Sequence, residues 1–380
     1  MMRSTALAAF LLFPAAANAG LMLSANDGKQ IVKGDPTPRT PDSVDVLDMG
    51  HYPPRVIGSV HIPAAMIGSP NAIAVGKGEK FAIITAAQKY VDADPENPAP
   101  DDKVTVIDLA DPAHPRFLQT VHAGPTPGGI TINRAGTLVL VASKGDDAIH
   151  VFTLSGKHLT PAGKVDLGKG AAPTDVVFAP DGRKAYAVAW GANRITELGI
   201  DGTHVMRSGR DVATGINPYG ATVTRDGNWL LNTNVGGALD RKTSGTLTMI
   251  DLKSGMLALN LEVGKVPEHV ALSPDGRHAA LVLANGASTV KSDPKYDGLV
   301  GIIRIYAVGP GTLTPVAQAD SCHWAQGLAW SDDGSLVLQQ CAAERAIQLF
   351  RFDGSSLKRD DSATLTFVSR PGSLSTQHSR

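Results

Sequence analysis

Short runs of alternating apolar and polar residues recur along most of the chain and predict β-strands. One such unit begins at Ala172-Pro173, continues through an alternating strand, turns at Asp181-Gly182 and returns in a second apolar strand over 185–188. A period of two is typical of a half-buried strand, and an Asp-Gly turn joins two antiparallel strands. The unit is therefore predicted to be the inner hairpin of a larger sheet.

The same unit returns along the chain. Copies run from Asn217-Pro218 to Asp226-Gly227 and from Val266-Pro267 to Asp275-Gly276, and weaker ones from Thr126-Pro127 to Gly136, from Trp324-Ala325 to Asp333-Gly334 and from Ser69-Pro70 to Gly78. A repeat of about 40 to 50 residues is the signature of a β-propeller, because one blade cannot bury its own faces. Helical periodicity is absent, which excludes a sheet built from alternating strands and helices.

Outer strands follow the hairpins, as in 103–109, 245–252 and 301–306, and complete six units between Ser69 and Val368. The chain ends supply complementary pieces of a seventh. Residues 44–49 and 54–56 match outer strands, 21–28 match a second strand, and 370–376 match an innermost strand with its proline. We therefore expect an all-β, seven-bladed propeller of four-stranded antiparallel blades, closed by the N- and C-terminal strands, which leaves no exposed sheet edge. Six blades with frayed ends is the alternative.

The first 19 residues predict a secretory signal peptide. Arg3 is followed by an apolar run from Ala6 to Ala16 and by the small residues Ala17-Asn18-Ala19, and this run is too short to span a bilayer. We expect a single domain over 20–380 without a transmembrane segment, in the periplasm or secreted. Lys plus Arg (35) nearly balances Asp plus Glu (36), and no basic stripe predicts contact with nucleic acid.

Cys322 and Cys341 are the two cysteines of the chain. Export to an oxidising compartment favours a disulfide between them, which would contribute roughly 3 kcal/mol; a reactive thiol is the alternative. The 11 histidines are scattered, without a spacing typical of zinc or haem ligation. No metal and no cofactor is expected.

The Pro-led strands, the Pro-Asp-Gly turns and the outer strands of Val-x-Val-Ile-Asp-Leu type give the chain a family likeness. It resembles the YVTN-repeat propellers and the related seven-bladed lactonase family, which includes 6-phosphogluconolactonase-like proteins. The resemblance implies a Pro-Arg-His group that acts on a sugar lactone at the channel. The matching segment is Pro267-Glu268-His269, so the histidine is kept and the arginine is replaced by an acid.

Candidate site residues follow from the propeller geometry, in which the segments that begin the innermost strands gather at one mouth of the channel. The candidates for catalysis are His269, Glu268, Asp175 and Arg370, and those for ligand binding are Asn71, Thr174, Asn217, Tyr219, Trp324 and Gln326. A histidine beside an acid is typical of a general base, and an arginine can stabilise an oxyanion. Ordinary structural roles in strand and rim are the alternative for each residue.

Two connections between second and third strands look unusually long, 88–102 and 286–298. Both are expected on the mouth side, where long loops on a rigid scaffold often bind ligands. Asp92, Asp94 and Glu96 lie in the first, but their spacing matches no EF-hand loop.

Three functional hypotheses remain open from the sequence. The first is an exported binding propeller that takes a small polar or carbohydrate-like ligand, or a periplasmic protein partner, at the channel mouth. The second is a hydrolase that opens a sugar-derived lactone with His269. The third is an accessory to a periplasmic oxidoreductase that docks through the opposite face.

Overall fold

The structure is a computed structural model that describes residues 20–31, 35, 37–92, 97–237, 243–287, 292 and 298–378. The predicted signal peptide lies outside the described residues, as do Asp94 and Glu96. Within them, no helix is long and apolar enough to cross a membrane.

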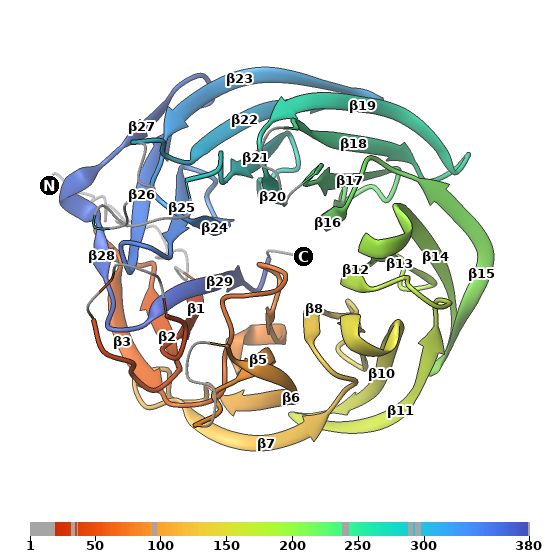
Figure 1. The fold of residues 1–380 in the computed structure, drawn as a ribbon, viewed down its shortest axis with the longest axis horizontal. Coiled ribbons are helices and arrows are strands. Elements are labelled where there is room, and N and C mark those ends of the chain that lie inside the picture. Colours follow the sequence, from red (N-terminus) through yellow and green to blue (C-terminus); the bar gives the residue numbers. More distant parts are fainter. Residues whose placement is uncertain are drawn as a thin grey trace, which may run out of the picture.

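Seven antiparallel sheets stand around a central axis (Figure 1), which confirms the predicted propeller. We number the blades from the first complete one. Blade 1 contains β4 (Ile73–Val75), β5 (Phe81–Lys89), β6 (Ala99–Asp108) and β7 (Arg116–His122); blade 2 contains β8 (Pro127–Ile132), β9 (Leu138–Ser143), β10 (Ala148–Ser155) and β11 (His158–Asp166); blade 3 contains β12 (Pro173–Phe178), β13 (Lys184–Ala189), β14 (Arg194–Asp201) and β15 (His204–Ala213).

The remaining blades follow in the same order. Blade 4 contains β16 (Pro218–Val223), β17 (Trp229–Asn234), β18 (Gly245–Asp251) and β19 (Met256–Gly264); blade 5 contains β20 (Pro267–Leu272), β21 (His278–Leu283), β22 (Ile302–Gly309) and β23 (Thr312–Asp320); blade 6 contains β24 (Ala325–Trp330), β25 (Leu336–Cys341), β26 (Ala346–Phe352), β27 (Leu357–Arg359) and β28 (Leu365–Thr366); blade 7 contains β29 (Arg370–Thr376), β1 (Leu21–Asp27), β2 (Ser43–Asp48) and β3 (Arg55–Val60).

The apolar residues of each strand pack between neighbouring blades. Leu140 and Val176 belong to one buried cluster that joins blades 2 and 3, and Leu23 and Ile84 belong to another that joins blades 7 and 1. Each such side chain contributes roughly 1.5 to 3 kcal/mol when fully buried. The alternation seen in the sequence therefore supplies both faces of every blade with a core.

The ring closes by pairing the two ends of the described chain. Strand β1 pairs with β2 on one side and with the C-terminal β29 on the other, with Leu23 opposite Ser375. In Figure 1, the blue β29 runs beside the red β1 and takes the innermost place in blade 7. This arrangement confirms the predicted closure and the seven blades.

Two details differ from the sequence-based expectation. Strands β5 and β6 extend into the segment expected to be a long loop, so Gln88 and Lys89 pair with residues 99–100 and the connection shortens to 90–98. In blade 6 the outermost strand is divided into β27 and β28, which both pair with β26. Each of the other six blades has the four strands that were predicted.

Candidate functional site

One face of the ring carries the starts of the innermost strands, and we call it the mouth face. Five of these strands are preceded by a residue in the left-handed backbone conformation: Thr126, Ala172, Asn217, Val266 and Trp324, with φ between 43° and 58°. The connections after the second strands reach the same face, since Lys144 N–H donates to the Thr126 carbonyl (3.1 Å) and Ala284 N–H to the Val266 carbonyl (2.9 Å). The predicted site residues are thus gathered on one side.

A buried polar network crosses the channel beneath this face. His269 Nδ1 accepts a hydrogen bond from Leu328 N–H (3.0 Å), so Nε2 carries the proton and donates to Asn71 Oδ1 (2.9 Å). Asn71 Nδ2 donates to Asp175 Oδ2 (2.8 Å), which also accepts from Ala221 N–H (3.0 Å). Asn71, Asp175 and His269 are at most 7% exposed and come from blades 1, 3 and 5. Residues from non-adjacent blades can bond directly only by meeting across the channel, so these side chains close it.

Glycines on the intervening strands give the network its room. A Cβ added at Gly129 would lie 2.0 Å from Asp175 Oδ1 and 2.8 Å from the Asp175 Cα, and one at Gly220 would lie 3.2 Å from the Glu268 carbonyl oxygen. A Cβ at Gly327 would lie 2.7 Å from Gln340 Oε1. Around the channel, blades 1, 3 and 5 therefore contribute a polar side chain to the network, and blades 2, 4 and 6 have a glycine on the innermost strand.

Tyr219 covers the network from the mouth side. Its hydroxyl donates to the carbonyl oxygen of Gly68, which leads into blade 1, so the side chain spans the channel from blade 4. Burial, together with the nearby carboxylates of Glu268 and Asp175, raises the pKa of the hydroxyl. Trp190 meets the tyrosine ring edge-on at 5.4 Å. Tyr219 is thus part of the seal over the channel.

The other ligand-binding candidates have mainly local partners. Thr174 Oγ1 donates to the Tyr219 carbonyl (2.8 Å), and Asn217 Nδ2 donates to the Gly236 carbonyl (2.8 Å). Trp324 N–H bonds the Ala287 carbonyl. Gln326 is 4% exposed, and its Oε1 has no hydrogen-bond partner among the residues that the structure describes. Glu268 is half-buried near Tyr219.

Arg370 lies between blades 6 and 7. Its guanidinium donates to the carbonyl oxygens of Ala342 (2.8 Å) and Ala343 (3.2 Å) and forms an ion pair with Asp35. Arg345 approaches the same carboxylate at 3.4 Å. The hydrogen bonds of Arg370 therefore join the last blade to its neighbour instead of reaching the network around His269.

The ion pair between Asp35 and Arg370 is expected to raise the free energy of unfolding, and this effect should be lost in acid. Burial disfavours the charged form of Asp35, but hydrogen bonds from Thr37 and the ion pair with Arg370 outweigh it and lower the pKa to about 2 from 3.8. Because the folded pKa is depressed, the contribution is complete above the unfolded pKa near 4 and is lost as pH falls toward 2. The difference in unfolding free energy between the native protein and Asp35→Asn, measured by urea titration, should be constant above pH 5 and shrink below pH 4. A difference independent of pH would contradict this assignment.

The disulfide joins Cys322 to Cys341 on the mouth side, with a Cα–Cα distance of 5.6 Å, as the sequence led us to expect. It ties the segment before β24 to the end of β25. Glu344 and His323 lie beside it, with His323 Nδ1 and Glu344 Oε1 2.6 Å apart. A disulfide is typical of proteins in oxidising compartments.

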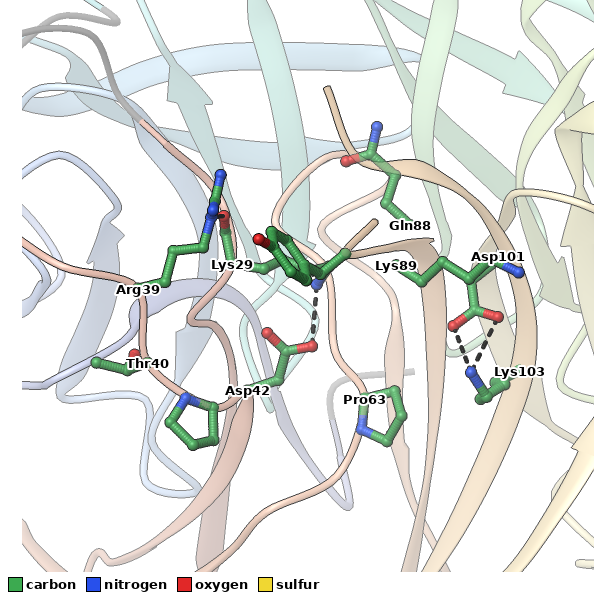
Figure 2. Close-up of a pocket in the computed structure, with 11 residues that line it drawn as sticks. Lys29, Arg39, Thr40, Asp42, Pro63, Gln88, Lys89, Asp101 and Lys103 are labelled. Carbon is green, nitrogen blue, oxygen red and sulfur yellow. Dashed lines mark hydrogen bonds and ion pairs between the residues drawn. The ribbon is translucent and has the colours of Figure 1, made fainter. Parts of the chain in front are cut away.

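A pocket of about 520 Å³ opens on the mouth face beside the sealed channel. It lies where blade 7 meets blade 1, between the β1–β2 connection and the β5–β6 hairpin (Figure 2). Its lining residues are Lys29, Arg39, Thr40, Pro41, Asp42, Pro63, Gln88, Lys89, Tyr90, Asp101 and Lys103. A volume of this size is typical of small-molecule sites.

Four of these lining residues, Gln88, Lys89, Tyr90 and Asp101, belong to the segment 88–102 that was predicted as a long mouth-side loop, and the others were not expected from the sequence. The signal was present: 15 residues separate the strand that ends at Asp27 from the one that begins at Ser43, and the intervening segment contains Lys29, Arg39 and Asp42. The β1–β2 connection is therefore a further long loop on the mouth face.

The pocket is rigid at its base. Lys29 is 6% exposed, and its Nζ bonds Asp42 Oδ2 (3.0 Å) and the Ala64 carbonyl and lies 3.3 Å from Asp27 Oδ1. Burial raises the pKa of Asp42, and the Asp27 carboxylate adds to this against the opposing effect of Lys29. Lys103 Nζ pairs with Asp101 at 3.0 Å on the far wall. The Lys29 contacts hold the β1–β2 connection in place, whereas Asp101 and Lys103 pair within β6.

The fold and site together define a seven-bladed propeller with a closed channel and a pocket at the rim. The profile of the family described as lactonase, 7-bladed beta-propeller, matches residues 118–291. This match runs from β7 of blade 1 through blades 2 to 4 and the inner hairpin of blade 5, and it confirms the resemblance to the lactonase propeller family. No curated protein matches the sequence.

Solved structures share the fold over almost the whole chain. The periplasmic gluconolactonase of Pseudomonas aeruginosa is 13% identical, with a TM-score of 0.70 over 95% of this chain and 99% of its own. A provisionally assigned 6-phosphogluconolactonase of Bacteroides uniformis is 18% identical, with a TM-score of 0.67 over 94% and 99%. A functionally unknown protein of Desulfotomaculum acetoxidans is 10% identical, with a TM-score of 0.70 over 95% and 100%. At such identities, the likeness concerns the fold alone.

Proposed function

We propose that the protein is an exported binding propeller that takes a small polar molecule on its mouth face, without chemistry at the channel centre. The observation that carries this proposal is the network across the channel, in which both ring nitrogens of His269 and the Asp175 carboxylate already hold partners from other blades. The pocket at the junction of blades 7 and 1 offers about 520 Å³ of space on the mouth face.

The same network weighs against general-base catalysis. A general base needs a free lone pair within hydrogen-bond reach of the proton that it removes. The lone pair of His269 Nδ1 is occupied by Leu328 N–H, and Nε2 donates to Asn71. Tyr219 covers the group from above, and Arg370 is held by Ala342, Ala343 and Asp35. A lactone would have to displace several of these contacts before reacting.

Lactone hydrolysis is the second candidate, because the matched family segment contains Asp175 and His269. In that mechanism His269 would activate a water molecule after Tyr219 moved aside. The two candidates make opposite predictions about ring opening.

We expect the purified native protein to leave the rate of ring opening of a panel of aldonolactones at the rate in buffer alone. Acid release would be followed in a pH-stat, with His269→Ala as the matched variant and a thermal melt to show that it is folded. The reason is that the only histidine in the network has no free lone pair. A native rate well above buffer that falls at least tenfold in folded His269→Ala would overturn the binding proposal in favour of hydrolysis.

A further inference from the structure

We infer that the pocket between the β1–β2 connection and the β5–β6 hairpin binds small hydroxycarboxylates, molecules with one carboxylate and several hydroxyl groups. This inference rests on the proposed function and names its ligand class. It is drawn from the charges of the pocket wall, from polar atoms left without partners, and from the rigid surfaces around them.

The charge of the wall is unevenly compensated. Lys29 is balanced by Asp42 and Asp27, and Lys103 is balanced by Asp101. Arg39 and Lys89 have no carboxylate partner among the described residues. The lining has four cations and two carboxylates, and the buried Asp27 carboxylate beside Lys29 brings the balance to one positive charge, which suits a ligand with a single negative charge.

Arg39 is held in a fixed orientation at the pocket. Its Nε donates to the Lys29 carbonyl (3.0 Å), and its guanidinium carbon lies 4.5 Å from the centre of the Tyr90 ring. Nη2 has no hydrogen-bond partner within the described part of the chain. A guanidinium oriented in this way presents its remaining N–H groups as a fork, and a carboxylate matches that fork.

Gln88 indicates that the ligand also carries a hydrogen-bond donor. Its Oε1 is buried and has no hydrogen-bond partner among the residues described. In the view of Figure 2, Gln88 and Arg39 lie on either side of the Lys29–Asp42 pair. A carbonyl oxygen accepts hydrogen bonds and cannot donate, so it requires a donor such as a hydroxyl group. The carboxylate and hydroxyl requirements therefore come from different residues.

The remaining surfaces favour a compact molecule with an apolar side. Tyr90, Pro41 and Pro63 contribute apolar surface to the lining, and the carbon atoms of a compact ligand can pack on it. Doubly charged phosphate groups are less well matched, because the four cations exceed the nearby carboxylates, Asp27 included, by one charge. We therefore favour a carboxylate over a phosphate.

Calorimetric titration of the mature, full-length protein tests this inference with D-glucuronate and D-glucose, a pair that differs in one carboxylate. Glucuronate should bind at least tenfold more tightly than glucose, and Arg39→Gln should weaken glucuronate at least tenfold. Arg39→Lys keeps the charge but loses the fork, so it should fall between the two. Gln88→Leu should weaken both sugars. Arg134→Gln, an exposed arginine of the β8–β9 turn, is the matched control and should change neither.

Each outcome has a defined meaning. Equal affinity for the two sugars, tighter binding of glucose 6-phosphate than of glucuronate, or no binding of glucuronate would overturn the inference. Unchanged glucuronate affinity in Arg39→Gln would place the ligand elsewhere and overturn it too. In all of these cases the proposed binding function survives unless the lactone assay shows turnover by His269, so the two failures are distinguishable.

Discussion

Replacing Asp175 with alanine is expected to lower the free energy of unfolding by about 4 kcal/mol. The change removes an acceptor of three buried donors, Asn71 Nδ2, Ala221 N–H and Val176 N–H. The loss of a buried hydrogen bond costs roughly 1 to 3 kcal/mol, and three such bonds to Asp175 are removed here. Because Asn71 also holds His269, the disturbance should extend to three blades. Urea denaturation followed by tryptophan fluorescence measures the loss.

The control for this variant is Asp201→Ala. Asp201 is an exposed aspartate at the end of β14 in the same blade, so its replacement should change the free energy by no more than about 0.5 kcal/mol. If both variants lost the same small amount, the network would not contribute to stability as described.

Replacing Gly129 with alanine is expected to destabilise the protein by about 3 kcal/mol, although only one methyl group is added. The new Cβ would lie 2.8 Å from the Cα of Asp175, and a backbone atom cannot move aside as a flexible side chain can. Strands β8 and β12 would have to separate, which weakens the packing between blades 2 and 3. The melting temperature and the denaturation midpoint should both fall.

Gly199→Ala is the matched control, because a Cβ at this β14 position meets nothing within 4 Å and Gly199 does not have a positive φ. Alanine there should be neutral or slightly stabilising, since it restricts the unfolded chain. Equal losses at Gly129 and Gly199 would show that strand glycines matter for their conformation and not for the space beside Asp175.

The architecture was predictable because it is repeated. Each copy of the Pro-led strand and Asp-Gly turn is encoded by neighbouring residues, and the matching outer strands at 44–49 and 104–109 revealed where the terminal pieces belong. Local patterns specify local pairing, and six repetitions of a local pattern, with matching pieces of a seventh at the chain ends, leave few alternatives for the whole.

The site was harder to predict because its contacts are distant in sequence. Asn71 and His269 are 198 residues apart, and nothing near either residue indicates that they bond. The sequence indicated that three polar residues, His269, Asn71 and Asp175, lie at the starts of innermost strands. It did not indicate that they form hydrogen bonds with one another. Arg370 was expected to share their site because it occupies the equivalent place in its blade, yet Ala342, Ala343 and Asp35 hold it at a seam.

The strand that seals the ring, β29, leaves the ribosome after all the other strands of the ring, although its partner β1 precedes them. Until residues 370–376 are synthesised, the six complete blades form an open arc. One edge of β1 then has no partner strand. The order of synthesis thus differs from the order around the ring. A circular permutation that joins the two chain ends and opens the chain between two other blades would build blade 7 from one continuous segment. It would also move the closure of the ring away from the pocket.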